Sequence, residues 1–62
     1  MTIEVWKVTL VEFRYGAKYY YFVRASSAGV AERRALKVAR KEGYESMSCE
    51  VAEFVGYCHI VR

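Results

Sequence analysis

The chain has 62 residues and a mass of 7.2 kDa, which predicts a single domain over residues 1–62 and excludes a doubly wound sheet or two lobes. Hydrophobic residues make up 55% of the chain and charged residues 27%, which excludes disorder, and no apolar run approaches the roughly 20 residues of a membrane span. The net charge of +3 suits an anionic partner but is far from that of a polybasic protein. The first four residues lack the basic start of a signal peptide, so we expect a cytoplasmic protein.

Residues 2–13 are rich in β-branched and aromatic side chains and contain no glycine or proline, so they predict a strand. Residues 14–17 include Gly16, which we expect at a positive φ in a hairpin turn leading to a second strand over residues 18–24. The pattern then becomes helical, and either Ser26 or Ser27 is the expected helix N-cap.

Residues 28–42 predict an amphipathic helix, because good helix formers dominate them. At 100° per residue, small and apolar side chains form one stripe, so the helix is expected to lie close against a sheet. The stripe comprises Ala28, Ala31, Ala35, Val38 and Ala39, with Leu36 at its margin. The opposite side carries five cations, which we call the helix cations: Arg33, Arg34, Lys37, Arg40 and Lys41. Gly43 occupies the place of a C′ glycine, and Tyr44 is expected to fold back on the last turn.

Residues 47–61 predict a third strand. Gly56 near its middle indicates either one bent or bulged strand or an additional short hairpin around residues 55–56. The order strand, strand, helix, strand with a right-handed crossover predicts an α+β fold of the β-β-α-β type. In this fold a three-stranded antiparallel sheet, in the order 2-1-3, carries one helix packed on one face.

One helix covers only one face of such a sheet. The alternation of side chains places Trp6, Val8 and Leu10 of the first strand, with Tyr21, Val23 and Ala25, on the helix side. The opposite side, which we call the outer face, comprises Lys18, Tyr20, Phe22 and Arg24 with Val5, Lys7, Thr9 and Val11. An exposed aromatic strip indicates a homodimer that forms through this face or an edge strand, or a surface for another protein or nucleic acid. A monomer whose tyrosines only shelter the sheet is the third interpretation.

The helix cations are a second candidate site, because phosphate recognition needs cations at such density and arginine adds bidentate geometry. Glu32 and Glu42 offset part of this charge, and a solvated helix face is the simpler interpretation. The predicted strands carry Glu4, Glu12, Glu50 and Glu53. Positive charge therefore concentrates on the helix, which favours a binding function.

The sequence predicts neither an enzyme nor a cofactor. His59 is the only histidine, no aspartate is present to orient it, and the single glycines form no phosphate-binding loop. Cys49, Cys58 and His59 offer three metal ligands at poor spacing, whereas a closed zinc site takes four, so no metal is expected. The two cysteines are an odd number of residues apart and would point to opposite faces of a strand. We therefore expect buried free thiols and no disulfide.

The stretch Tyr-Phe-Val-Arg-Ala-Ser-Ser at residues 21–27, followed by Ala-Glu-Arg-Arg-Ala at residues 31–35, resembles a strand-to-helix passage of very small phage and prophage proteins. Some anti-CRISPR inhibitors share their β-β-α-β plan, and the likeness covers residues 2–54 in plan. The resemblance implies a non-enzymatic protein that occupies a surface of a larger, in some cases nucleic-acid-containing, machine, and it carries over no site residue. We therefore expect a protein-interaction module that uses the outer face, with a nucleic-acid binder that uses the helix cations as the alternative.

Overall fold

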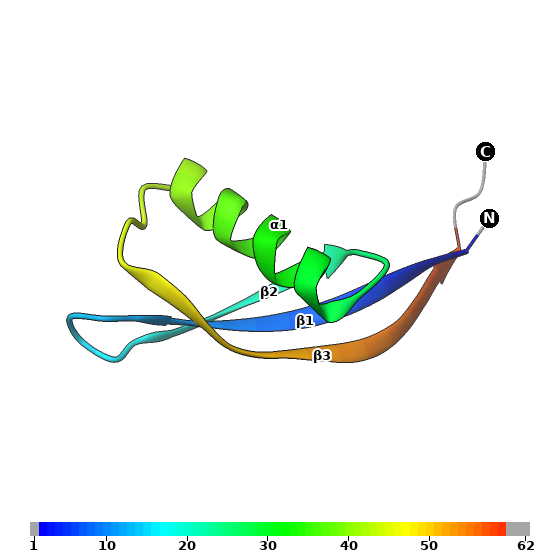
Figure 1. The fold of residues 1–62 in the computed structure, drawn as a ribbon, viewed down its shortest axis with the longest axis horizontal. Coiled ribbons are helices and arrows are strands. Elements are labelled where there is room, and N and C mark those ends of the chain that lie inside the picture. The colour runs from blue at the N-terminus through cyan, green and yellow to red at the C-terminus, as the bar shows by residue number, and fades with distance from the viewer. Residues whose placement is uncertain (1, 60–62) are drawn as a thin grey trace.

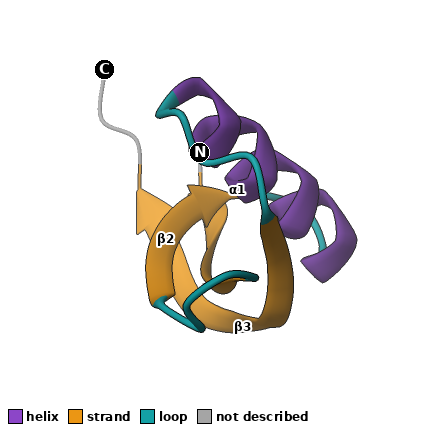
Figure 2. Ribbon diagram, turned by 90° about the vertical axis from the view of Figure 1, so that its left-hand side faces the viewer, coloured by secondary structure: helices purple, strands orange, loops and turns teal. Residues whose placement is uncertain are grey.

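The computed structural model describes the backbone of residues 2–59 and the side chains of residues 3–58. Its elements are β1 (Thr2–Glu12), β2 (Lys18–Arg24), α1 (Ala28–Lys41) and β3 (Met47–His59). The sheet is antiparallel in the order β2-β1-β3, and α1 lies on one side of it (Figure 1). Viewed along the strands, the sheet is strongly curved (Figure 2). The fold class and strand order predicted from the sequence are confirmed.

The turn of the hairpin between β1 and β2 contains Gly16 at a positive φ, as predicted. Gly16 has a φ of 68°, in the left-handed region that favours glycine, and its N–H donates to the carbonyl of Glu12. Phe13 lies outside β1, one residue beyond the observed end of the strand, and its N–H donates to the carbonyl of Ser46. The hairpin end is therefore tied to the segment that precedes β3.

Both ends of α1 are capped by local chemistry that the sequence indicates. Of the two candidate serines, Ser27 is the N-cap, and its Oγ accepts a hydrogen bond from the N–H of Val30 at 3.4 Å. At the other end Gly43 has a φ of 98° and donates to the carbonyl of Arg40. The N–H of Tyr44 donates to the carbonyl of Ala39, which completes a Schellman motif and folds Tyr44 back on the helix as expected.

The core lies between α1 and the inner side of the sheet. Its buried members are Val8, Leu10, Ala25, Ala31, Ala35 and Ala39. The predicted stripe is wrong at two positions, because Ala28 is exposed in the first turn and Val38 is 41% exposed. Positions 31, 35 and 39 form the fully buried row of α1, since residues four apart nearly eclipse one another along a helix. Val30 and Leu36 are partly buried against the same core. Val38 lies beside this row instead of within it.

β3 is one continuous strand, which decides against the additional hairpin. Its 13 residues pair with the 11 of β1 through two register shifts, one between Val5 and Trp6 and one between Thr9 and Leu10. The first shift lies at residues 54–56 of β3, so Gly56 marks a bulge as predicted. Residues 60 and 61 of the predicted strand lie outside the described residues. Within residues 2–59 no helix has the length and apolar character needed to cross a membrane.

Candidate interaction surface

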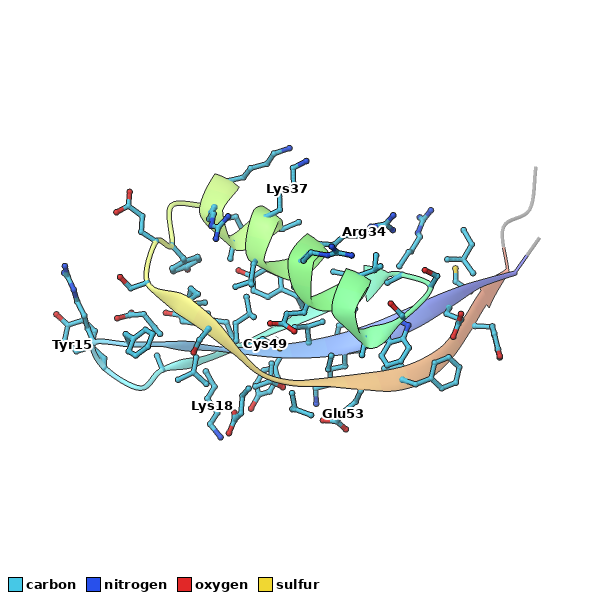
Figure 3. The ribbon with its side chains drawn as sticks, in the orientation of Figure 1. Tyr15, Lys18, Arg34, Lys37, Cys49 and Glu53 are labelled. Carbon is cyan, nitrogen blue, oxygen red and sulfur yellow. The ribbon has the colours of Figure 1, made fainter. Side chains whose placement is uncertain are left out.

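The outer face is the side of the sheet that α1 leaves uncovered. Lys18 of β2 and Glu53 of β3 project from this side, away from the helix (Figure 3). All four predicted residues of β2 on this face are exposed, with Tyr20 at 56% and Phe22 at 65%. The alternating burial along β2 reproduces the two faces that the sequence predicts.

The middle of the outer face is covered by its own side chains. Thr9 of β1 lies between Tyr20 of β2 and Val51 of β3 in the register and is only 5% exposed. The flanking residues Lys7 and Val11 are half-buried. The exposed aromatic rings of the outer face are those of Tyr20 and Phe22, on β2.

Charges on the outer face are divided between its two edges. Lys18 and Arg24 lie on β2, whereas Glu50 and Glu53 lie on β3. Lys18 Nζ is 3.2 Å from Glu50 Oε2 across the face, and both side chains are about half exposed, so the pair contributes little stability. Lys7 Nζ stands 4.7 Å from the centroid of the Tyr20 ring, a cation–π contact. The β2 edge is thus both aromatic and basic.

The helix cations are all exposed. Within residues 3–58 the only ion pair is the one between Lys18 and Glu50, so none of the five is neutralised by Glu32 or Glu42. Arg34 also holds the end of β2, because its Nη1 donates to the carbonyl of Arg24 at 2.6 Å. The helix cations therefore remain available to an external anion.

Only some of the helix cations line a groove. Three of them border a shallow groove of about 410 Å³ between α1 and the free side of β2, which we call the α1/β2 groove. Its lining consists of Phe22, Val23, Arg24, Arg34, Lys37, Val38 and Lys41. Arg33 and Arg40 are not among these residues. The groove unites residues of both predicted sites, and it was not predicted from the sequence although positions 34, 37, 38 and 41 share one side of the helix.

Tyrosines between β2 and the end of α1 are structural. The rings of Tyr19 and Tyr44 are 4.8 Å apart, and Tyr21 is half-buried beside them. Partial burial, followed by the nearby Glu42 carboxylate, raises the pKa of Tyr21 to about 12. Its hydroxyl therefore loses its proton only at a higher pH than that of a free tyrosine.

The two cysteines are free. Cys49 is half-buried opposite Leu10, and burial raises the pKa of its thiol, which disfavours the reactive thiolate. Cys58 is exposed, so the expectation of a buried thiol is wrong there, because it lies near the end of an edge strand that no element covers. Among the described side chains no three acidic, histidine or cysteine residues are grouped as metal ligands. The side chain of His59 lies outside the described residues.

No protein-family model, curated protein or solved structure matches the chain significantly. The function is therefore inferred from the outer face and the α1/β2 groove, which meet along strand β2.

Proposed function

We propose that the protein is a non-enzymatic binding module that engages a protein partner through its outer face. The observation that carries the proposal is the exposure of Tyr20 and Phe22, 56% and 65%, side by side on a sheet face that no helix covers. Contiguous apolar surface of this kind marks interaction sites. Tyrosine and arginine dominate the binding energy of many interfaces, and Arg24 adjoins the two rings on β2.

The resemblance to small phage proteins extends this proposal to a mode of action. A protein of 62 residues can inhibit a larger assembly simply by occupying one of its surfaces. The basic character of the β2 edge favours a partner surface that carries acidic side chains. A second copy of the chain, bound face to face as a homodimer, is the alternative partner.

The test compares two pairs of substitutions that remove the same kinds of side chain. The double variant Tyr20→Ser with Phe22→Ser alters the outer face, whereas Phe13→Ser with Tyr15→Ser alters two rings near the hairpin turn that are 77% and 83% exposed. Each tagged protein is used to capture partners from nuclease-treated host extract, and circular dichroism checks its folding.

We expect the wild type and the hairpin variant to capture the same partner. The outer-face variant should bind that partner about tenfold or more weakly, as for interface hot spots. Sedimentation of the pure proteins tests the homodimer, whose mass should fall to that of a monomer in the outer-face variant. Equal capture and equal mass for all three proteins would show that the outer face binds nothing.

Nucleic-acid binding by the helix cations is the second candidate function. It is favoured by the five exposed cations that have no acidic partner within the described side chains. Binding of this kind weakens steeply with salt, because each neutralised phosphate releases counterions. We expect the triple variant Arg33→Glu, Arg34→Glu, Lys37→Glu to abolish the shift of a labelled oligonucleotide in a gel. A shift that is insensitive to salt, or no shift by the wild type, would exclude this function.

A further inference from the structure

Strand β2 has an open edge whose backbone groups can be assigned from the pairing. The N–H of Ala25 donates to the carbonyl of Glu4, and the N–H of Glu12 donates to the carbonyl of Ala17, on either side of the β1–β2 ladder. In an antiparallel ladder such hydrogen-bonded pairs alternate with non-bonded pairs. The odd-numbered residues of β2 therefore bond to β1. The N–H and carbonyl groups of Tyr20 and Phe22 point the opposite way, to the open edge.

The open edge is free over its middle and closed at one end. The carbonyl of Arg24 also points away from β1, and it is occupied by the guanidinium of Arg34 at 2.6 Å. Within the described part of the chain no hydrogen bond takes up the outward groups of Tyr20 or Phe22. A short ladder of unpaired donors and acceptors thus runs along β2 and ends at Arg34.

The other edge of the sheet is protected, whereas the β2 edge is not. β3 carries two bulges against β1, at the register shifts Val5/Trp6 and Thr9/Leu10, and bulges twist an edge away from a further strand. β2 pairs with β1 over seven consecutive residues without a shift. A regular edge strand with large apolar side chains is a template for an added strand. The structure therefore offers one edge to a partner, and that edge is β2.

The α1/β2 groove borders the open edge at residues 22–24, and its lining indicates what kind of strand fits there. Its lining includes four cations, Arg24, Arg34, Lys37 and Lys41, and no acidic residue. Apolar surface is supplied by Phe22, which is 65% exposed, and by Val38, which is 41% exposed. Side chains of an added strand would alternate between the helix side and the outer face. The helix side of that strand would meet Lys37 and Lys41.

We propose that the β2 edge and the α1/β2 groove bind an extended acidic segment of a partner protein as a fourth strand of the sheet. The segment's backbone pairs with Tyr20 and Phe22, its acidic side chains face the cations of α1, and its apolar side chains cover Phe22. This inference rests on the proposed protein-binding function and deepens it by naming the partner's conformation and charge.

Charge complementarity separates this occupant from a second copy of the chain. Two β2 strands paired symmetrically about Tyr21, the centre of β2, would place Lys18 opposite Arg24 of the second copy. Like charges directly opposite in a ladder are destabilising. Both copies would also bring the cations of α1 to the interface between the two β2 strands. An acidic segment would replace each of these repulsions with an attraction between opposite charges. A nucleic acid would satisfy the cations but would leave the backbone ladder unused.

The first arm of the test addresses the ladder. The probe is a fluorescent synthetic peptide, about as long as β2, in which Glu alternates with Val, and its binding is followed by anisotropy. Phe22→Pro removes one outward N–H and leaves the β1–β2 ladder intact, because proline is tolerated at an edge position that faces solvent. Phe22→Val is the matched control, since it also removes the ring but keeps the N–H. We expect Phe22→Pro to bind about five to ten times more weakly than Phe22→Val.

The second arm addresses the charge of the groove. Lys37→Glu with Lys41→Glu reverses two lining cations, and Arg33→Glu with Arg40→Glu makes the same charge change on the same helix outside the groove. Because only the first pair lines the groove, we expect it to weaken peptide binding at physiological salt about tenfold more than the second pair. Amide hydrogen exchange provides the direct readout, because bound peptide should protect the amides of Tyr20 and Phe22.

Several results would overturn the inference. These are no binding of the peptide, equal binding by Phe22→Pro and Phe22→Val, or equal weakening by the two charge pairs. Binding of oligothymidylate but not of the peptide would assign the groove to nucleic acid, and a wild-type dimer lost only in Phe22→Pro would assign the edge to a second copy. If Phe22→Pro does not fold, Tyr20→Pro against Tyr20→Val makes the same comparison.

Failure of this inference is distinguishable from failure of the proposed function. A host partner that is captured equally by Phe22→Pro and Phe22→Val but is lost with Tyr20→Ser and Phe22→Ser would show that the outer face binds without the edge.

Discussion

Substitution of Ala35 by leucine tests the close approach of α1 to the sheet. Ala35 is fully buried in the middle of the row that contacts the strands, between Ala31 and Ala39. Three added carbons would gain about 2.4 kcal/mol of burial, at about 0.8 kcal/mol each, if space existed for them. A side chain with no exposed surface in a row of alanines has no such space, so the helix must lift away from Val8 and Leu10. Overpacking of this kind costs about 1–3 kcal/mol.

The expected loss is large relative to the stability of so small a domain. A chain of this length rarely exceeds about 3–5 kcal/mol in its free energy of unfolding. Ala35→Leu should therefore remove about a fifth or more of that free energy and lower the melting temperature by roughly 5–20 °C. Urea unfolding followed by the fluorescence of Trp6, the single tryptophan, measures the change.

The matched control makes the same substitution at an exposed alanine of the same helix. Ala28 lies in the first turn and is exposed, so Ala28→Leu should change the free energy of unfolding by less than about 0.5 kcal/mol. If Ala35→Leu is as stable as the wild type, the alanine row does not set the distance between helix and sheet.

Two further predictions concern the backbone at Gly43, which follows α1, and the titration of the Tyr21 hydroxyl. Gly43 has a φ of 98°, and apart from its chain neighbours no residue lies within 4 Å of the position that an added Cβ would take. Gly43→Ala should therefore cost about 1–2 kcal/mol of purely backbone origin, measured by thermal unfolding. An unchanged melting temperature would contradict this prediction. Burial raises the pKa of Tyr21 to about 12 from 10.0 in a free tyrosine, so the stability that its neutral form supplies is complete below pH 10 and is lost as the pH rises toward 12. Tyr21→Phe should therefore lose less stability than the wild type between about pH 9 and 11.5 in urea titrations, and identical losses would argue against burial of this hydroxyl.

Strand β2 is central to the proposed function because it belongs to two surfaces at once. Tyr20 and Phe22 present their rings on the outer face, while their backbone groups face the open edge. Arg34 lies at the end of that edge and ties the helix to it through the carbonyl of Arg24. A partner that contacts β2 therefore meets the aromatic rings, the free ladder and the cations of α1 within one continuous surface.

The sequence alone determined the fold class, the strand order and the two faces of the sheet. The choice of Ser27 over Ser26 as N-cap, and of one bulged strand over an additional hairpin, came from the structure. Alternation along β2, the serine before α1 and Gly43 after it are local features whose physical consequences hold in any tertiary context. A helical wheel cannot show which side of α1 lies beside the open edge of β2. Tertiary packing decided this. That choice separated Arg34, Lys37 and Lys41 from Arg33 and Arg40 and moved Val38 from the core to the groove. It depends on how the helix rotates to fit its alanine row against the sheet, which is a property of both surfaces together.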